Sequence, residues 1–148
     1  MRVKVLYSRT GRSAQLLSKL VRVELLGQTL PQTVDPTDIV VSLGYMKRIP
    51  ESIWSKCLTV NVHPGILPVF AGRHPQLRAL ADLKRSYTAV ILHSIVSDEY
   101  DVGPGLSTTL VDITERDRDD PNAFFERTRL IGVYMVAAFL IGKGANAV

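Results

Sequence analysis

Cysteine is almost absent from this sequence, because Cys57 is the single cysteine among 148 residues. One cysteine excludes an intrachain disulfide and leaves no cysteine pair to hold a zinc ion or an iron–sulfur cluster. No spacing of histidine, cysteine and aspartate along the chain is typical of a metal site, so we expect no metal. The lack of disulfides favours a reducing compartment, and we expect a cytoplasmic protein.

Long hydrophobic runs are also missing. The most apolar segment, residues 130–142, lies between Arg129 and Lys143. It is shorter than the roughly 20 residues that a membrane-spanning helix needs. The N-terminus has two basic residues but no apolar stretch of the kind found in signal peptides. We therefore expect no membrane partner and interpret residues 130–142 as part of a buried helix.

The charge balance is only mildly basic, with 18 basic and 14 acidic side chains and a formal net charge of +4. The basic residues are scattered, and no stripe of alternating aromatic and basic side chains occurs, which argues against nucleic acid as a partner. An anionic small molecule is compatible with this charge. The length suits one domain, and we expect residues 1–148 to form it.

Apolar, β-branched segments alternate with segments of helical periodicity along the chain. Such alternation is typical of an α/β protein with a Rossmann-like, mostly parallel sheet and helices on both faces. The connection between the last two strands is short enough for an antiparallel hairpin at one edge. The predicted strands cover residues 3–8, 38–44, 57–63, 87–97 and 106–114, and the predicted helices cover 12–27, 50–56, 75–85 and the region from residue 120 onward.

Four loops are the natural places for a functional site, namely those after residues 8, 43, 61 and 97. All four follow predicted strand ends. In open parallel sheets, ligands bind beyond the carboxyl ends of the strands. The polar residues of these loops are therefore the candidates for groups that act together.

Asn61 and His63 end the predicted strand 57–63. Side chains two residues apart on a strand point to the same side, so both can reach one space beyond the strand end. An amide N–H and an imidazole can together bind an oxygen that gains negative charge, and histidine can also transfer a proton near neutral pH. The alternative is a strand end with a hydrogen-bonded histidine of structural importance only.

The turn at residues 97–105 holds three acidic residues, Asp98, Glu99 and Asp101, before two glycines that flank a proline. An acidic turn is typical of a solvated hairpin loop. Asp101, however, stands directly before a tight bend, where its carboxylate could orient or charge an imidazole. His93 lies within an apolar run, and we interpret it as a core or edge residue.

The loop at residues 8–15 connects the first strand to the first helix. Backbone N–H groups at the start of that helix, with Arg9 and Arg12 beside them, could hold a phosphate or a carboxylate. The loop is not a Walker motif and lacks a full G-x-G-x-x-G pattern. The alternative is an ordinary strand-to-helix turn with solvated arginines.

Three segments in this order resemble the folate-dependent formyltransferases, a family that includes phosphoribosylglycinamide and methionyl-tRNA formyltransferases. They are "DIVVSLGYMKRIPESIW", "TVNVHPGILPVFAG" and "VSDEYDVGPGL", and the similarity covers residues 38 to about 106. Family members typically carry Asn-x-His-Pro-Ser-Leu-Leu-Pro, where this chain has Gly65 in place of Ser and Ile66 in place of the first Leu. The later aspartate and its Gly-Pro turn match Asp101 to Pro104.

The resemblance implies a formyltransferase fold and transfer of a formyl group from 10-formyltetrahydrofolate to an amine. It implies that Asn61 and His63 stabilise the oxyanion, and that Asp101 positions His63 and helps to move the proton. It also implies two binding regions. The expected donor-binding residues are Tyr45, Met46, Lys47, Ile49, Val96, Ser97, Asp98 and Val102, and the expected acceptor-binding residues are Arg9, Thr10, Gly11, Arg12 and Ser13.

The chain departs from the family in length. Between Gly27 and Asp38 it has only a short linker, where relatives place one or two further βα units. We expect a truncated fold whose open sheet edge could be completed in a homodimer. The acceptor is then a small amine, and Arg9 and Arg12 suggest a phosphorylated nucleotide or sugar, similar to glycinamide ribonucleotide. The alternative is a catalytically silent relative that binds folate or a nucleotide.

Overall fold

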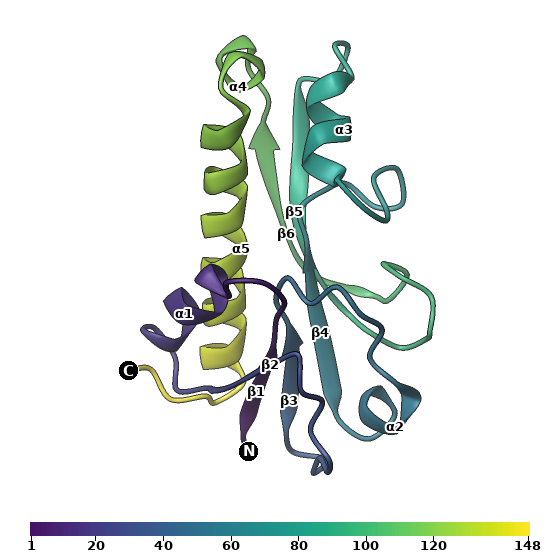
Figure 1. Cartoon of the computed structure of the whole chain (residues 1–148), viewed down its shortest axis with the longest axis vertical. Helices are drawn as coiled ribbons and strands as arrows, with labels where there is room; N and C mark the ends of the chain where they lie inside the picture. The colour runs from purple at the N-terminus through teal and green to yellow at the C-terminus, as the bar shows by residue number, and fades with distance from the viewer.

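A computed structural model describes all residues from 1 to 148. Its centre is one six-stranded sheet with the strand order β2-β1-β3-β4-β5-β6 (Figure 1). Apolar, β-branched runs form the central strands, and β1 and β3 are buried at all four positions. The strands are β1 (Val3–Leu6), β2 (Glu24–Gly27), β3 (Ile39–Ser42), β4 (Leu58–His63), β5 (Tyr87–Ser94) and β6 (Gly105–Asp112).

The strand pairings confirm the predicted α/β architecture. The pairs β2–β1, β1–β3 and β3–β4 are parallel, whereas the pairs β4–β5 and β5–β6 are antiparallel. The hairpin predicted at one edge is therefore present as β5 and β6. The loop after β5 does not follow a parallel strand, as the sequence suggested, because β5 runs against β4. Asp101 of this loop nevertheless lies beside His63 at the end of β4.

Helices cover both faces of the sheet. Helices α1 and α5 pack on one face in a cluster that includes Leu17, Val60 and Val136. Helix α2 packs on the other face through Ile53, against Leu6 and Val40. None of these helices is both long enough and apolar enough to cross a membrane. The helices are α1 (Arg12–Ser18), α2 (Glu51–Trp54), α3 (Pro75–Ala81), α4 (Glu115–Asp119) and α5 (Pro121–Gly142).

The helix predicted over residues 12–27 is wrong in its second half. Helix α1 ends at Ser18, and Glu24–Gly27 is strand β2, which pairs in parallel with β1. The helical spacing of the leucines arises because Leu17 packs on the sheet from α1, while Leu25 belongs to β2 and pairs with Val5. Pairing with a neighbouring strand has therefore overridden the local helical preference.

The two edges of the sheet differ. Strand β2 is short, with four residues, whereas β6 has eight residues and most of them are exposed. Leu110 on β6 is 69% exposed, and no charged residue precedes Asp112 on this strand. An exposed, uncharged edge can accept another strand, so the homodimer expected from the sequence would pair most readily at β6. The homodimer itself stays a prediction.

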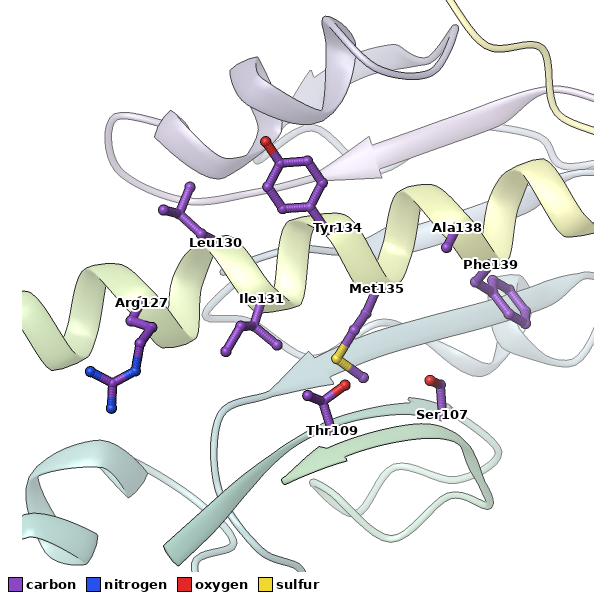
Figure 2. Close-up of a pocket in the computed structure, with 9 residues that line it drawn as sticks. All are labelled: Ser107, Thr109, Arg127, Leu130, Ile131, Tyr134, Met135, Ala138 and Phe139. Carbon is purple, nitrogen blue, oxygen red and sulfur yellow. The ribbon is translucent and has the colours of Figure 1, made fainter. Parts of the chain in front are cut away.

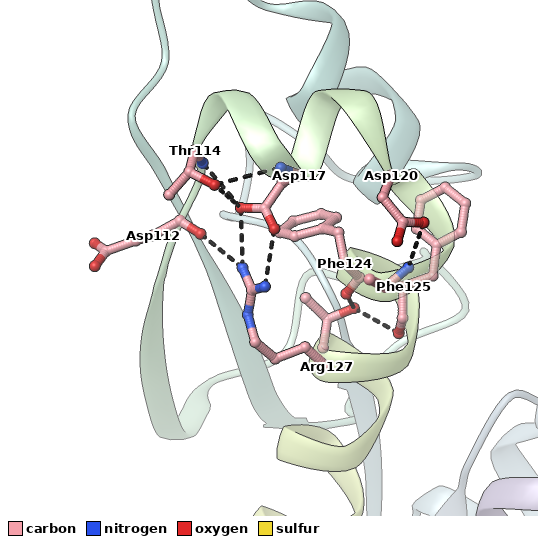
Figure 3. Close-up of polar contacts among 9 residues, drawn as sticks. Asp112, Thr114, Asp117, Asp120, Phe124, Phe125 and Arg127 are labelled. Atoms are coloured by element: carbon pink, nitrogen blue, oxygen red, sulfur yellow. Dashed lines mark hydrogen bonds and ion pairs between the residues drawn. The ribbon is translucent and has the colours of Figure 1, made fainter.

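Helix α4 was not predicted, and a capping box explains its start (Figure 3). The Thr114 hydroxyl accepts a hydrogen bond from the Asp117 N–H, and the Asp117 carboxylate accepts one from the Thr114 N–H at 2.8 Å. The Arg127 guanidinium of α5 donates to both carboxylate oxygens of Asp117, at 2.9 and 3.1 Å, and to the carbonyl of Asp112 at 3.0 Å. This network joins the end of β6 to α4 and α5.

The Asp117→Asn variant should be less stable than the wild type at neutral pH. The Arg127 guanidinium lowers the pKa of Asp117 from the usual 3.8 to about 2. With Arg127 nearly half exposed, the loss should be about 1–2 kcal/mol of the free energy of unfolding. Because the folded-state pKa is the lower one, the stabilisation is present above about pH 4 and disappears as the pH falls through about 2. Urea unfolding at several pH values measures it. Glu115→Gln, on the exposed side of α4, should have little effect.

Candidate active site

The site begins at the carboxyl end of the parallel strands. Asn61 on β4 pairs with Ser42 on β3, which pairs with Leu6 on β1, so these strand ends lie level with one another. The chain leaves β1 in one direction, toward β2, and returns on the other side as β3. In such sheets this reversal opens a crevice at which ligands bind. Asn61 and His63 point to the same side of β4, as predicted.

Asp101 reaches His63 from the hairpin between β5 and β6. Its carboxylate oxygen Oδ1 lies 3.3 Å from Nδ1 of His63, and its other oxygen, Oδ2, accepts a hydrogen bond from the N–H of Gly72 at 2.9 Å. The backbone of Asp101 is left-handed, with φ of 60°, so the bend predicted after this residue begins at Asp101 itself. The side chains of His63 and Asp101 are 6% and 8% exposed. The juxtaposition expected from the resemblance is therefore present.

His93 is a further member of the site, and the sequence analysis missed this role. It lies directly opposite Asn61 in the antiparallel pair of β4 and β5. Its Nε2 lies 3.2 Å from the amide nitrogen of Asn61 and 3.5 Å from Oδ1 of Asp101, and its Nδ1 lies 3.1 Å from the carbonyl of Ser94. That carbonyl can only accept, so Nδ1 carries a proton. The Nε2 atom can then accept a hydrogen bond from Asn61, which leaves the second amide N–H of Asn61 free.

Residues 70–72, which follow β4 by several residues, close the site on another side. The carbonyl of Phe70 lies 2.5 Å from Nε2 of His63. His63 is thus held between two hydrogen-bond acceptors, this carbonyl on one ring nitrogen and Asp101 on the other. Two acceptors fix the plane of the ring, and both favour the protonated imidazole.

The pKa of His63 lies below its usual range. Burial is the main cause, because it disfavours the charged imidazolium. The Phe70 carbonyl and the Asp101 carboxylate oppose this effect, whereas the His93 ring and the positive charge of Arg78 add to it. His63 is therefore mostly neutral near pH 7 and can take up a proton during a reaction.

The pKa of Asp101 is also below its usual range. Burial alone would raise it, but the neighbouring His93 ring, the hydrogen bond from the Gly72 N–H and the nearby His63 ring outweigh that effect. Asp101 is consequently a carboxylate at neutral pH. It supplies a fixed negative charge beside two imidazoles, an arrangement suited to moving a proton between them.

The two loops expected to bind the donor meet in the structure. Arg48 lies over the ring of Tyr100, with its guanidinium carbon 5.1 Å from the ring centroid, and Ile95 packs against the cluster that holds Tyr45 and Ile49. Tyr45 and Ile49 are buried, whereas Met46 and Lys47 are exposed. On the hairpin side, the remaining predicted residues lie at or near the surface: Val96, Ser97, Asp98 and Val102. Arg48 and Tyr100 were not predicted from the sequence.

The residues expected to bind the acceptor lie at the start of α1. Arg9, Thr10 and Arg12 are exposed, while Gly11 is buried beneath the Tyr7 ring, where a Cβ atom would come within 2.4 Å of that ring. Arg12 makes an exposed ion pair with Glu126 of α5 at 3.4 Å. The hydroxyl of Ser13 accepts a hydrogen bond from Arg129 at 3.4 Å. No hydrogen bond or ion pair joins this group to Asn61, His63 or Asp101.

A large open groove lies elsewhere, between α5 and β6 (Figure 2). Its volume is about 670 Å³, and apolar side chains of α5 such as Tyr134 and Met135 dominate its lining. Ser107 and Thr109 line its β6 side. Their alternation with Thr108 places them on the sheet face that α5 covers, opposite to His63. Arg127 is its one ionisable side chain other than Tyr134, so the groove has no group for acid–base chemistry.

Comparison with known proteins agrees with this geometry. The model of the formyl transferase family matches residues 3–135. Phosphoribosylglycinamide formyltransferase of Mycobacterium tuberculosis is 34% identical over 113 residues, which are 75% of this chain and 51% of that protein. Methionyl-tRNA formyltransferase of Listeria monocytogenes is 28% identical over 112 residues, which are 72% of this chain and 35% of that protein. The chain thus spans about half or less of the length of these relatives.

Solved structures share the fold. Phosphoribosylglycinamide formyltransferase of Streptococcus pneumoniae superimposes with a TM-score of 0.71 at 19% identity, covering 95% of this chain and 97% of that one. Rv3404c of Mycobacterium tuberculosis, described as a candidate sugar N-formyltransferase, gives a TM-score of 0.74 at 21% identity, covering 99% of this chain and 70% of that one. With the family model matching most of the sequence, the chain belongs to the formyl transferase family.

Proposed function

We propose that this protein transfers a formyl group from 10-formyltetrahydrofolate to a small amine. The observation that supports the proposal most strongly is the convergence of Asn61, His63 and Asp101 at the carboxyl end of β4. These residues come from a strand and a hairpin separated by about 40 positions in the sequence. An amide donor, an imidazole and a carboxylate in one place are the groups that amine acylation through an oxyanion requires.

The reaction forms one bond and breaks one bond at the formyl carbon. The acceptor amine attacks this carbon, and the carbonyl oxygen becomes an oxyanion. The free amide N–H of Asn61 donates a hydrogen bond to this oxyanion, and the positive charge of a protonated His63 stabilises it electrostatically. The oxyanion then collapses, and the bond to N10 of the folate breaks. The amine loses one proton and N10 gains one. Asp101 accepts and returns that proton, with His63 as its partner.

The donor would lie between the loop 44–49 and the hairpin 95–104. These segments meet at Arg48 and Tyr100, so an aromatic pteridine would find an aromatic ring and a planar cation at the edge of its site. Tyr45 and Ile49 would support the inner wall, with Val96, Ser97, Asp98 and Val102 on the hairpin side. Met46 and Lys47 would lie on the open side.

A phosphorylated nucleotide or sugar is the class of acceptor that we propose. Arg9, Thr10, Gly11, Arg12 and Ser13 would bind its anionic group, because Arg9 and Arg12 add positive charge to a loop with free backbone N–H groups. Arg12 would have to exchange its exposed contact with Glu126 for the ligand. Such exposed ion pairs are weak, so the exchange costs little.

The Arg12→Ala variant should raise the KM for a phosphorylated acceptor about tenfold while changing the KM for the donor less than twofold. Lys19→Ala removes an exposed positive charge at the other end of α1 and is the matched control. Steady-state kinetics with each substrate varied in turn separates the two constants. An unchanged acceptor KM in Arg12→Ala would remove this loop from the acceptor site.

A catalytically silent relative that binds folate or a nucleotide is the second candidate, since the chain spans about half the length of one curated relative. Incubation with 10-formyltetrahydrofolate and a panel of amines, followed by mass spectrometry, distinguishes the two. Formyl transfer adds the mass of one carbonyl group to an amine. A folate-dependent rise in melting temperature without any formylated amine would favour the silent relative.

A further inference from the structure

Three consecutive residues, Phe70, Ala71 and Gly72, each make one backbone contact to a different side chain at the site. We call residues 70–72 the strap. The Phe70 carbonyl contacts His63, the Ala71 carbonyl accepts a hydrogen bond from Arg78 at 2.6 Å, and the Gly72 N–H donates to Asp101 at 2.9 Å. The strap therefore touches both His63 and Asp101, and the side chain that holds its middle is Arg78.

Arg78 is well placed to hold the strap. It lies on α3, which begins at Pro75, three residues after the strap ends. Its guanidinium carbon also lies 5.8 Å from the centroid of the Phe70 ring, and Arg85 lies 4.8 Å from the same centroid. The Arg78 side chain makes no ion pair with a carboxylate. Its one direct hydrogen bond is the contact to the Ala71 carbonyl. A planar cation of this kind can bond the carbonyl and stack on the ring at the same time.

We propose that Arg78 is a positioning residue, which fixes the strap and thereby sets the orientation of His63 and its distance from Asp101. Its kinetic consequence rests on the proposed formyl transfer, whereas its effect on the strap does not. Arg78 need not touch either substrate. It acts on the reaction through the Phe70 carbonyl and the Gly72 N–H.

The packing around Gly65 supports a strap that is held close to His63. A Cβ atom at Gly65 would lie 2.7 Å from Cβ of Pro75, 2.9 Å from Cβ of Phe70 and 3.4 Å from Nε2 of His63. The strap and the start of α3 therefore fill the space that a side chain at position 65 would occupy. Gly65 permits this close approach, and Arg78 holds the strap in it.

The first experiment compares three variants by steady-state kinetics. Arg78→Met removes the charge and the donor but keeps an apolar stem against Phe70. It should lower kcat about 30-fold with the donor KM within about twofold, because a small displacement of a catalytic group is costly. Arg78→Lys keeps a donor and the charge and should restore most of kcat. Arg73→Met removes an exposed charge next to the strap and should stay within about twofold of the wild type.

The second experiment needs no turnover. Amide hydrogen exchange at Gly72 should become faster in Arg78→Met than in Arg73→Met, since the Asp101 contact is loosened. Gly65→Ala should also speed this exchange, because its methyl group would crowd Phe70. Gly65→Ala should lower the pKa of His63 as measured by NMR, because the Phe70 carbonyl no longer favours the imidazolium, while the charges of Asp101 and Arg78 are unchanged.

The two experiments separate this proposal from the proposed function. Equal exchange at Gly72 in Arg78→Met and Arg73→Met would overturn the positioning role, whether or not the protein turns over. Equal kcat in those two variants of an active enzyme would overturn it as well. If Arg78→Met and Arg73→Met both slow catalysis while amide exchange at Gly72 is unchanged, Arg78 acts by its charge alone. If the wild type forms no formylated amine, the exchange result still decides the role of Arg78.

Discussion

The His63→Ala variant should lower kcat for formyl transfer by about 100-fold or more, with the donor KM changed less than about threefold. His63 is held between the Phe70 carbonyl and Asp101, so its removal takes away both the positive charge beside the oxyanion and the partner of Asp101 in proton transfer. The fold should persist, because the ring lies at the end of β4, outside the three apolar clusters of the core. Initial rates and a melting curve measure the two effects.

His74→Asn is the matched control for this loss. His74 is exposed, lies at the start of α3 and has a left-handed backbone that asparagine also tolerates. The kcat of His74→Asn should equal that of the wild type. If His63→Ala retained the wild-type kcat, the catalytic role proposed for this histidine would have to be withdrawn.

Asp101→Asn tests the second half of the pair through its pH dependence. Asparagine tolerates the left-handed backbone at this position, so the hairpin should keep its path. The Asp101 carboxylate favours the imidazolium form of His63, and its loss should therefore lower the pKa of His63 further. A smaller fraction of His63 is then protonated at neutral pH. The alkaline limb of the kcat/KM profile should move to lower pH and kcat at pH 7 should fall. An unchanged profile would separate Asp101 from His63.

Much of the fold followed from the sequence because its signals are local. The buried strands β1 and β3 are short β-branched runs, and the hairpin of β5 and β6 follows from a turn with two glycines and a proline. These local patterns predicted the wrong element where strand pairing determined the structure. Leucines at helical spacing extended α1 into β2, and nothing local marks Glu24–Gly27 as the neighbour of β1.

The site shows the same division. Asn61 and His63 could be assigned to one side of a strand from their spacing alone. Asp101 was singled out by the tight bend that follows it, whereas its pairing with His63 was implied only by the family resemblance. His93 escaped notice because its role depends on the register of an antiparallel pair, which sets it opposite Asn61. The strap and Arg78 depend on backbone contacts, and backbone groups carry no sequence signal. Local patterns thus give the ends of strands, while tertiary contacts decide which groups meet there.

The Gly103→Ala variant should damage both stability and activity, although residue 103 makes no contact with a catalytic group. A Cβ atom there would lie 1.4 Å from the carbonyl oxygen of Ser94 and 2.6 Å from its carbon, both of which are backbone atoms of β5. Neither can move without disturbing the pairs that Ser94 and Ile95 make with Pro104 and Thr59. Overpacking of this kind costs roughly 1–3 kcal/mol, so unfolding by urea should show a loss in this range.

Gly103→Ala should lower kcat more than its loss of stability alone would suggest. The hairpin must lift away from β5, and Asp101 lies two residues earlier in the chain. Displacement of its carboxylate by about 1 Å should cost about 100-fold in kcat. Gly105→Ala is a stringent control, since no atom lies within 4 Å of its Cβ position and it starts the same strand, β6. It should change stability by less than about 0.5 kcal/mol and leave kcat unchanged. Similar kinetics for Gly103→Ala and Gly105→Ala would mean that the path of the hairpin does not place Asp101, and the carboxylate would then have to reach His63 by some other arrangement of residues 95–104.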